Sequence, residues 1–224
     1  MNKSAGLLAL SLARAASRGE VIPTGLPELQ PESVSEVLVR NRAHVMVYRQ
    51  LEEQGGEAEQ SPLGRYLRPV VIGEGVRIKE RGKLCSLVAE VLAREGIEYA
   101  FFKTFSPSGT TGVDIDLVIP ESEFERATRS LLSAGFLSID SLEKRYATGF
   151  VLPGSGLVVD LHTAITVAGL SYFPSEVVLQ NTRMLRIQAG GREGDVRVAV
   201  EWVNSFVMAL HSMIKEGVMR FQEA

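Results

Sequence analysis

The sequence predicts an α+β protein in which helices at both ends flank a mixed β-sheet. Up to residue 96, every segment that can be assigned has apolar residues at helical spacing. From residue 97, β-branched and aromatic runs alternate with turns rich in Gly, Pro and Ser. A strongly helical pattern returns after residue 199. We therefore expect an N-terminal helical region (1–85), an α/β core (86–199) and a C-terminal helix packed on that core (200–224).

Composition narrows the class of protein. With 224 residues, of which 45% are hydrophobic, the chain can bury a substantial core. A net charge of -3 and a pI near 5.7 argue against an extensive nucleic-acid-binding surface. No run reaches the roughly 18 apolar residues that a membrane span needs. The single cysteine, Cys85, excludes an internal disulfide and favours a reducing, cytoplasmic location.

Three helices are predicted before the first strand. Residues 4–18 form an amphipathic pattern ended by Gly19, and Arg14 interrupts the apolar run that a signal peptide would require. One continuous helix is expected from about residue 33 to Gly55, and another over residues 83–95. Residues 63–72 contain too much Pro and Gly for an assignment.

The core is predicted to hold a sheet of about four or five strands. Residues 97–105 and 113–119 are its first two strands, and a helix follows over residues 123–134. An antiparallel hairpin comes next, with a tight turn at 154–156. Weaker strand patterns lie at 184–187 and 196–198, and the final helix is expected to bury one stripe of large side chains. The strands of the hairpin are 147–153 and 157–165, and the stripe is Trp202, Phe206, Leu210 and Ile214.

The second of these strands carries paired aspartates, Asp114 and Asp116, within the run VDIDLVI. Residues two apart in a strand point to the same face, so the two carboxylates are expected to lie side by side. Like charges in an apolar strand repel each other, and burying either one unpaired is costly. A divalent cation with a preference for oxygen ligands would offset them.

A third carboxylate, Asp160, lies in the run VVDLHTAI of the hairpin, where His162 shares its face. Three such carboxylates can hold two divalent ions about 3.5 to 4 Å apart for in-line displacement at phosphorus. We interpret His162 as a residue that orients a carboxylate rather than as a ligand.

A phosphate cradle is predicted directly before the paired aspartates. Lys103 and Thr104 lead into the loop SPSGTTG, whose backbone amides and hydroxyls could meet phosphate oxygens. The expected phosphate-binding residues are Lys103, Thr104, Ser108, Thr110 and Thr111.

Together, FFKTF, the loop, VDIDLVI, the helix and the hairpin ending in VVDLHTA resemble the DNA polymerase β-like nucleotidyltransferase superfamily, above all its uncharacterised archaeal and bacterial families. The resemblance spans about residues 86–217. It implies Asp114, Asp116 and Asp160 as catalytic metal ligands for Mg²⁺ or Mn²⁺, with Asp160 also helping to deprotonate the acceptor hydroxyl. The superfamily usually has a Gly-Ser pair where this chain has Lys103 and Thr104.

The resemblance implies an enzyme that moves a nucleoside monophosphate from an NTP, such as ATP, to a hydroxyl and releases pyrophosphate. The acceptor could be a small molecule, a protein side chain or an RNA end. The replacement of Gly-Ser by Lys103 and Thr104 favours an alternative, a catalytically inactive nucleotide-binding or metal-binding module that acts in regulation or as part of a toxin–antitoxin pair.

Overall fold

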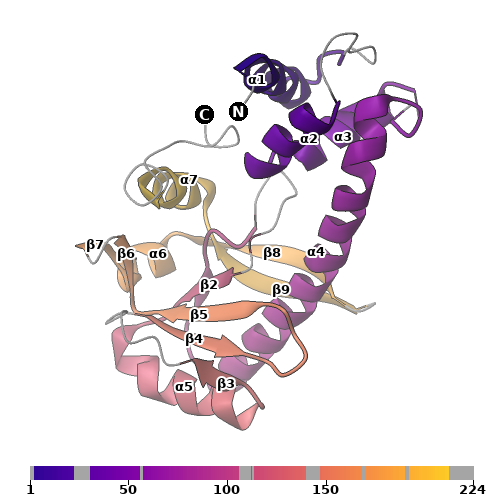
Figure 1. Ribbon diagram of the computed structural model, residues 1–224. Coiled ribbons are helices and arrows are strands. Elements are labelled where there is room, and N and C mark those ends of the chain that lie inside the picture. Colours follow the sequence, from indigo (N-terminus) through magenta and orange to yellow (C-terminus); the bar gives the residue numbers. More distant parts are fainter. Residues whose placement is uncertain are drawn as a thin grey trace. The chain divides into compact units, whose positions relative to one another are not determined.

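The computed structural model covers residues 1–224 and describes residues 3–22, 31–55, 58–105, 112, 114–139, 147–167, 170–189 and 192–211 (Figure 1). The chain folds into two compact units, which meet in sequence between Arg77 and Ile78. This junction lies inside one helix, as does the boundary at residue 85 expected from the sequence. We describe each unit by itself.

The first unit is helical. It contains α1 (Lys3–Ser17), α2 (Pro31–Arg40), α3 (His44–Glu53) and the start of α4 (Pro62–Arg94). The helix predicted at residues 4–18 is confirmed by α1, but the single helix predicted from residue 33 to Gly55 is wrong. Arg42 adopts a left-handed conformation with φ 54°, and the Ala43 N–H donates to the Leu38 carbonyl at 2.9 Å. This geometry ends α2, and no glycine signals it in the sequence.

Helix α4 runs for 33 residues and contains Pro69. The sequence supported a helix only over its last third, because proline and glycine within a helix are unfavourable. Packing explains the difference. Leu63 and Leu67 belong to the core of the first unit, whereas Leu84 and Leu92 belong to the core of the second. Burial at both ends outweighs the weak propensity of the middle.

The second unit is built on a mixed, seven-stranded sheet of order β3-β4-β5-β2-β1-β9-β8, which confirms the α+β class. The pairs β2–β5 and β1–β9 are parallel, and the other neighbours are antiparallel. The predicted hairpin is confirmed as β4 and β5, but the sheet has more strands than expected. Its strands are β1 (Ala100–Phe101), β2 (Asp114–Val118), β3 (Leu137–Ile139), β4 (Ala147–Val151), β5 (Val158–His162), β8 (Thr182–Ala189) and β9 (Arg192–Ala199).

Helices cover both faces of this sheet. On one face, α4 and α5 (Phe124–Ser133) pack on alternate strand residues such as Ile115, Leu117 and Val159. On the other face, α6 (Ser175–Gln180) and α7 (Glu201–Leu210) pack on Phe102 and Val118. The remaining elements are a short 3-10 helix (Glu121–Glu123) and a separate hairpin of β6 (Ala164–Val167) and β7 (Leu170–Pro174).

The prediction that the large side chains of the C-terminal helix are buried is wrong for Trp202 and Phe206 of α7. Trp202 and Phe206 are 52% and 47% exposed, whereas Val203 and Val207 are buried against the sheet. The helix has apolar residues on most sides, so its large aromatics do not mark its buried face. Ile214, the last member of the stripe, lies outside the described residues.

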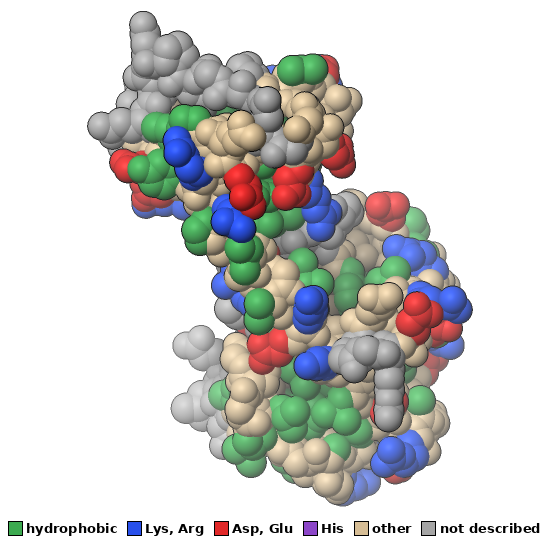
Figure 2. Space-filling view, turned by 90° about the vertical axis from the view of Figure 1, so that its right-hand side faces the viewer, with side chains coloured by type: hydrophobic (Ala, Val, Ile, Leu, Met, Phe, Trp, Pro, Cys, Tyr) green, Lys and Arg blue, Asp and Glu red, His purple; other side chains and the backbone are tan. Residues whose placement is uncertain are grey.

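The structure also shows where the single cysteine and the surface charges lie. Cys85 is fully buried, and burial raises the pKa of its thiol to about 12. Among the described helices, none is both long enough and apolar enough to cross a membrane. Among the described residues on the face that Figure 2 shows, Lys and Arg side chains are mixed with Asp and Glu.

His44 is a buried titratable group in the first unit. Its Nε2 lies 3.6 Å from Oε1 of the equally buried Glu74, which also accepts a hydrogen bond from Arg77 at 2.8 Å. Burial lowers the pKa of His44 below its ordinary value of 6.5, although the Glu74 carboxylate acts in the opposite direction.

We predict that His44 makes the chain less stable in mild acid. Because the pKa of the folded state is the lower one, the unfolded chain binds more protons below about pH 6.5, and stability falls as the pH drops through this range. Urea denaturation at pH 7.5 and at pH 5.5 should show a smaller loss for His44→Gln than for the parent. Equal losses in the two proteins would contradict the prediction.

Candidate metal centre

The pairing register of the parallel strands β2 and β5 brings the residues of the candidate metal centre together. In the β2–β5 pair, Asp116 lies directly opposite Asp160, and Val118 lies opposite His162. Side chains alternate along a strand, so Ile115, Leu117 and their partners face α4 and α5. Asp116, Asp160 and His162 therefore share the opposite face of the sheet.

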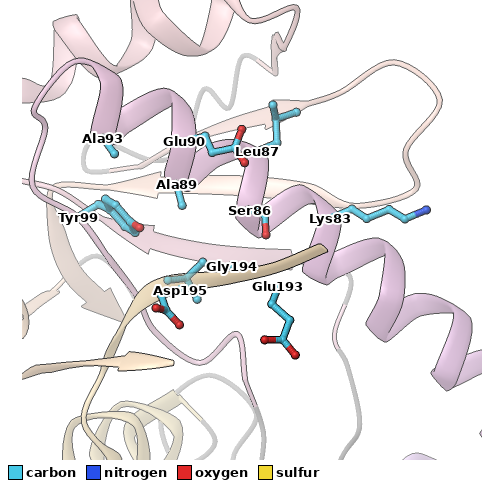
Figure 3. Close-up of a pocket in the computed structure, with 11 residues that line it drawn as sticks. Lys83, Ser86, Leu87, Ala89, Glu90, Ala93, Tyr99, Glu193, Gly194 and Asp195 are labelled. Atoms are coloured by element: carbon cyan, nitrogen blue, oxygen red, sulfur yellow. The ribbon is translucent and has the colours of Figure 1, made fainter. Parts of the chain in front are cut away.

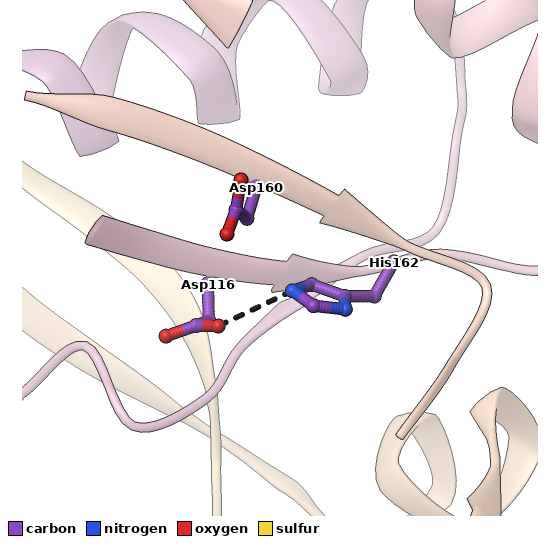
Figure 4. A group of neighbouring side chains, drawn as sticks. All are labelled: Asp116, Asp160 and His162. Carbon is purple, nitrogen blue, oxygen red and sulfur yellow. Dashed lines mark hydrogen bonds and ion pairs between the residues drawn. The ribbon is translucent and has the colours of Figure 1, made fainter. Parts of the chain in front are cut away.

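These three side chains form a compact, buried cluster (Figure 4). One ligand atom from each lies within 4.8 Å of the other two, and the residues are only 8% to 9% exposed. His162 Nε2 lies 3.2 Å from Asp116 Oδ1, and the imidazole packs edge to face on Phe102 with ring centroids 5.1 Å apart. The histidine thus contacts Asp116 directly.

Asp116 remains ionised within this buried position. Burial alone would raise the pKa of its carboxyl, but the Lys103 ammonium and the His162 ring more than offset burial and hold the pKa well below its usual range. Lys103 Nζ lies 3.0 Å from Asp116 Oδ1. A carboxylate, rather than a neutral acid, therefore faces Asp160.

The neighbouring strand leaves room for Asp160. Gly149 of β4 is paired with Asp160, and a Cβ at Gly149 would come within 3.3 Å of Asp160 Oδ1. Only a residue without a side chain keeps this contact free of crowding. The sequence shows Gly149 merely as a glycine within a strand, so its relation to Asp160 emerges only from the register.

Asp114 occupies a different environment from Asp116. It is the first residue of β2 and is exposed, and it lies opposite Val158 rather than a polar residue. Alternation places its side chain on the same face as Asp116. Among the described residues, the group close enough to share one ion comprises Asp116, Asp160 and His162, and does not include Asp114.

The side chains of Lys103 and Thr104 both contact Asp116. Lys103 pairs with Asp116, as described above. The Thr104 hydroxyl is buried and lies 3.1 Å from the Phe102 carbonyl and from both the backbone N and O of Asp116. Thr104 thus fixes the backbone of β2 beside the carboxylate. Ser108, Thr110 and Thr111 lie outside the described residues.

Two residues that the sequence did not single out brace the turn after β1. Arg81 of α4 is buried and donates to the Thr104 carbonyl at 2.7 Å and to the Gly112 carbonyl. Asn204 of α7 accepts the Lys103 N–H at 2.9 Å and donates to the Ala199 carbonyl at 3.0 Å. Neither residue belongs to a local motif, so only the tertiary structure could reveal these contacts.

The donor set suits a divalent cation. Two carboxylates and an imidazole supply ligands that Mn²⁺ accepts, and the carboxylates alone suit Mg²⁺. The Lys103 ammonium lies on one oxygen of Asp116. The residues therefore fit the divalent cation that the sequence implies.

A hollow elsewhere on the second unit is separate from this cluster (Figure 3). It is lined by residues of α4 and β9, including Ser86, Glu90 and Asp195, and by Tyr99, which directly precedes β1. None of its lining residues belongs to the group of Asp116, Asp160 and His162.

Comparison with protein-family models gave no match, and comparison with curated protein sequences gave none. A solved structure, the lincomycin-bound crystal structure of lincosamide antibiotic adenylyltransferase LnuA, is similar over 52% of this chain and 78% of that chain. The identity is 9% and the TM-score is 0.35.

We predict that Thr104→Val destabilises the chain by about 1 to 3 kcal/mol, because it leaves buried backbone groups of β2 without their hydroxyl partner. Thr182→Val is a matched control, since that half-buried hydroxyl makes one hydrogen bond of 3.4 Å. Chemical denaturation of both variants measures the difference. A Thr104→Val loss no larger than that of the control would show that the hydroxyl does not support β2.

Proposed function

We propose that this chain is a metal-dependent nucleotidyltransferase, which transfers a nucleoside monophosphate from an NTP to the hydroxyl of an acceptor. The observation that carries the proposal is the buried pair of Asp116 and Asp160. The two residues lie opposite each other on adjacent parallel strands, and His162 contacts Asp116. Such a pair of carboxylates is costly to bury without a cation. The likeness of its sequence runs to the polymerase β-like superfamily supports the same chemistry.

In this proposal, Asp116 and Asp160 hold Mg²⁺ or Mn²⁺, and Asp114 adds a further carboxylate from the exposed start of β2. The bound cation would supply charge neutralisation at the phosphates and would lower the pKa of an acceptor hydroxyl. His162 orients Asp116 through the contact at 3.2 Å. Gly149 keeps space for the Asp160 carboxylate.

The proposed reaction is an in-line displacement at the α-phosphorus. The acceptor oxygen forms a bond to the α-phosphorus, and the bond between that phosphorus and the bridging oxygen to the β-phosphate breaks. Asp160 accepts the hydroxyl proton, and pyrophosphate leaves with the electron pair of the broken bond. A small molecule, a protein side chain and an RNA end are the three acceptor classes.

The buried, unpaired thiol of Cys85 supports a reducing, cytoplasmic location.

A second candidate function is a nucleotide-binding or metal-binding module without catalysis, with a role in regulation or in a toxin–antitoxin pair. The ion pair between Lys103 and Asp116 favours it, because a lysine stands where the superfamily usually has glycine and neutralises one of the proposed ligands. The two functions differ in one product. Only the enzyme releases pyrophosphate.

Incubation of the chain with Mg²⁺ and NTPs labelled at the α-phosphate tests the proposal, with hydroxyl-bearing small molecules, proteins or RNA ends as acceptors. We expect label transfer with release of pyrophosphate, and a loss of at least about 100-fold in Asp116→Asn and in Asp160→Asn. Asp195→Asn is the matched control, because Asp195 lies in the same sheet, half exposed, and pairs with Arg186.

Two outcomes would count against the enzyme. Tight NTP binding without pyrophosphate release from any acceptor class would support the non-catalytic module instead. Activity in Asp116→Asn and Asp160→Asn equal to that of Asp195→Asn would show that the reaction takes place elsewhere on the chain.

A further inference from the structure

The ammonium group of Lys103 lies beside a carboxylate of the candidate metal centre. Lys103 Nζ is 3.0 Å from Asp116 Oδ1, the same oxygen that His162 Nε2 approaches at 3.2 Å. Both members of the ion pair are largely shielded, with side chains 20% and 12% exposed. The ammonium also lies 5.3 Å from the centre of the Phe102 ring, a favourable distance for a cation over an aromatic face.

The backbone is held in an unusual conformation that goes with this contact. Lys103 has φ 54°, in the left-handed region that residues other than glycine rarely adopt. Its N–H donates to Asn204 Oδ1, and Asn204 donates in turn to the Ala199 carbonyl. On the other side of the turn, Arg81 holds the Thr104 carbonyl. These contacts offset the conformational cost and fix the point from which the lysine side chain reaches Asp116.

The ammonium and a metal ion would compete for Asp116. Lys103 supplies one positive charge at Asp116, so its presence reduces the attraction of the cluster for a cation. A divalent ion that binds Asp116 and Asp160 would stand close to the ammonium and repel it. A triphosphate offers the lysine an alternative anion, and Lys103 is partly accessible and carries a long, flexible stem.

We propose that Lys103 is an exchangeable counter-ion, which occupies Asp116 when no metal is bound and moves to the phosphates when an NTP arrives. This inference rests on the proposed function, since it assumes that the centre takes a divalent cation and a nucleotide. Its consequence is that the metal binds weakly by itself. The nucleotide, by drawing Lys103 away, completes the metal site, so the two ligands bind together.

Removal of the Lys103 charge should therefore shift the affinities for two probes in opposite directions. With the full chain and Mn²⁺ alone, followed by electron paramagnetic resonance, Lys103→Met should bind about tenfold more tightly than the parent. With a non-hydrolysable NTP analogue in excess EDTA, followed by calorimetry, the same variant should bind about tenfold more weakly. A purely structural role of Lys103 would weaken both.

Two further variants separate charge from folding. Lys103→Gly also removes the charge, and glycine accepts the left-handed backbone without strain, so it gives the same test if Lys103→Met does not fold. Lys79→Met removes one exposed lysine of α4 and should leave both affinities unchanged.

Adding Asp116→Asn to Lys103→Gly distinguishes a failure of this inference from a failure of the proposed function. If Mn²⁺ binds Lys103→Gly no more tightly than the parent, yet the added Asp116→Asn weakens it, the metal centre stands and the counter-ion role is overturned. If the added Asp116→Asn has no effect, the ion is not held by Asp116, and both proposals fail.

Discussion

The structure of the second unit depends on one constraint, the burial of two carboxylates side by side on a sheet. The parallel register of β2 and β5 places Asp116 opposite Asp160 on a face where neighbouring positions are apolar. Like charges at that distance destabilise the fold unless cations offset them. The Lys103 ammonium meets this requirement at Asp116, where His162 adds a polar contact, and the absence of a side chain at Gly149 leaves space for the Asp160 carboxylate. The candidate centre is therefore part of the packing of the sheet.

Much of the fold could be predicted where the signal is local. The hairpin of β4 and β5 follows from two strand-like runs on either side of a Gly-Ser-Gly turn, and α5 follows from its strong helical periodicity. The prediction failed where tertiary contacts override local preference. Helix α4 continues through Pro69 because both of its ends are buried, and Arg42 interrupts the predicted long helix without a glycine to announce it.

The same distinction between local signals and tertiary contacts applies to the candidate site. Alternation within one strand predicts that Asp114 and Asp116 share a face, and the structure adds that Asp116 is buried while Asp114 is exposed at the strand's start. The pairing of Asp116 with Asp160 requires the register between strands that are far apart in sequence. The left-handed backbone of Lys103 depends on Asn204 and Arg81, from two different helices, so the sequence could not place the ammonium on Asp116.

The most direct test of the central claim, that Asp116 and Asp160 share a cation, is a crystal structure with Mn²⁺ and a non-hydrolysable NTP analogue. Anomalous scattering locates the ion without reference to the rest of the electron density. We expect a peak at coordination distance from both carboxylates, with the Lys103 ammonium moved from Asp116 to the phosphates. An ion bound elsewhere, with Lys103 still paired to Asp116 in the presence of bound nucleotide, would contradict the account.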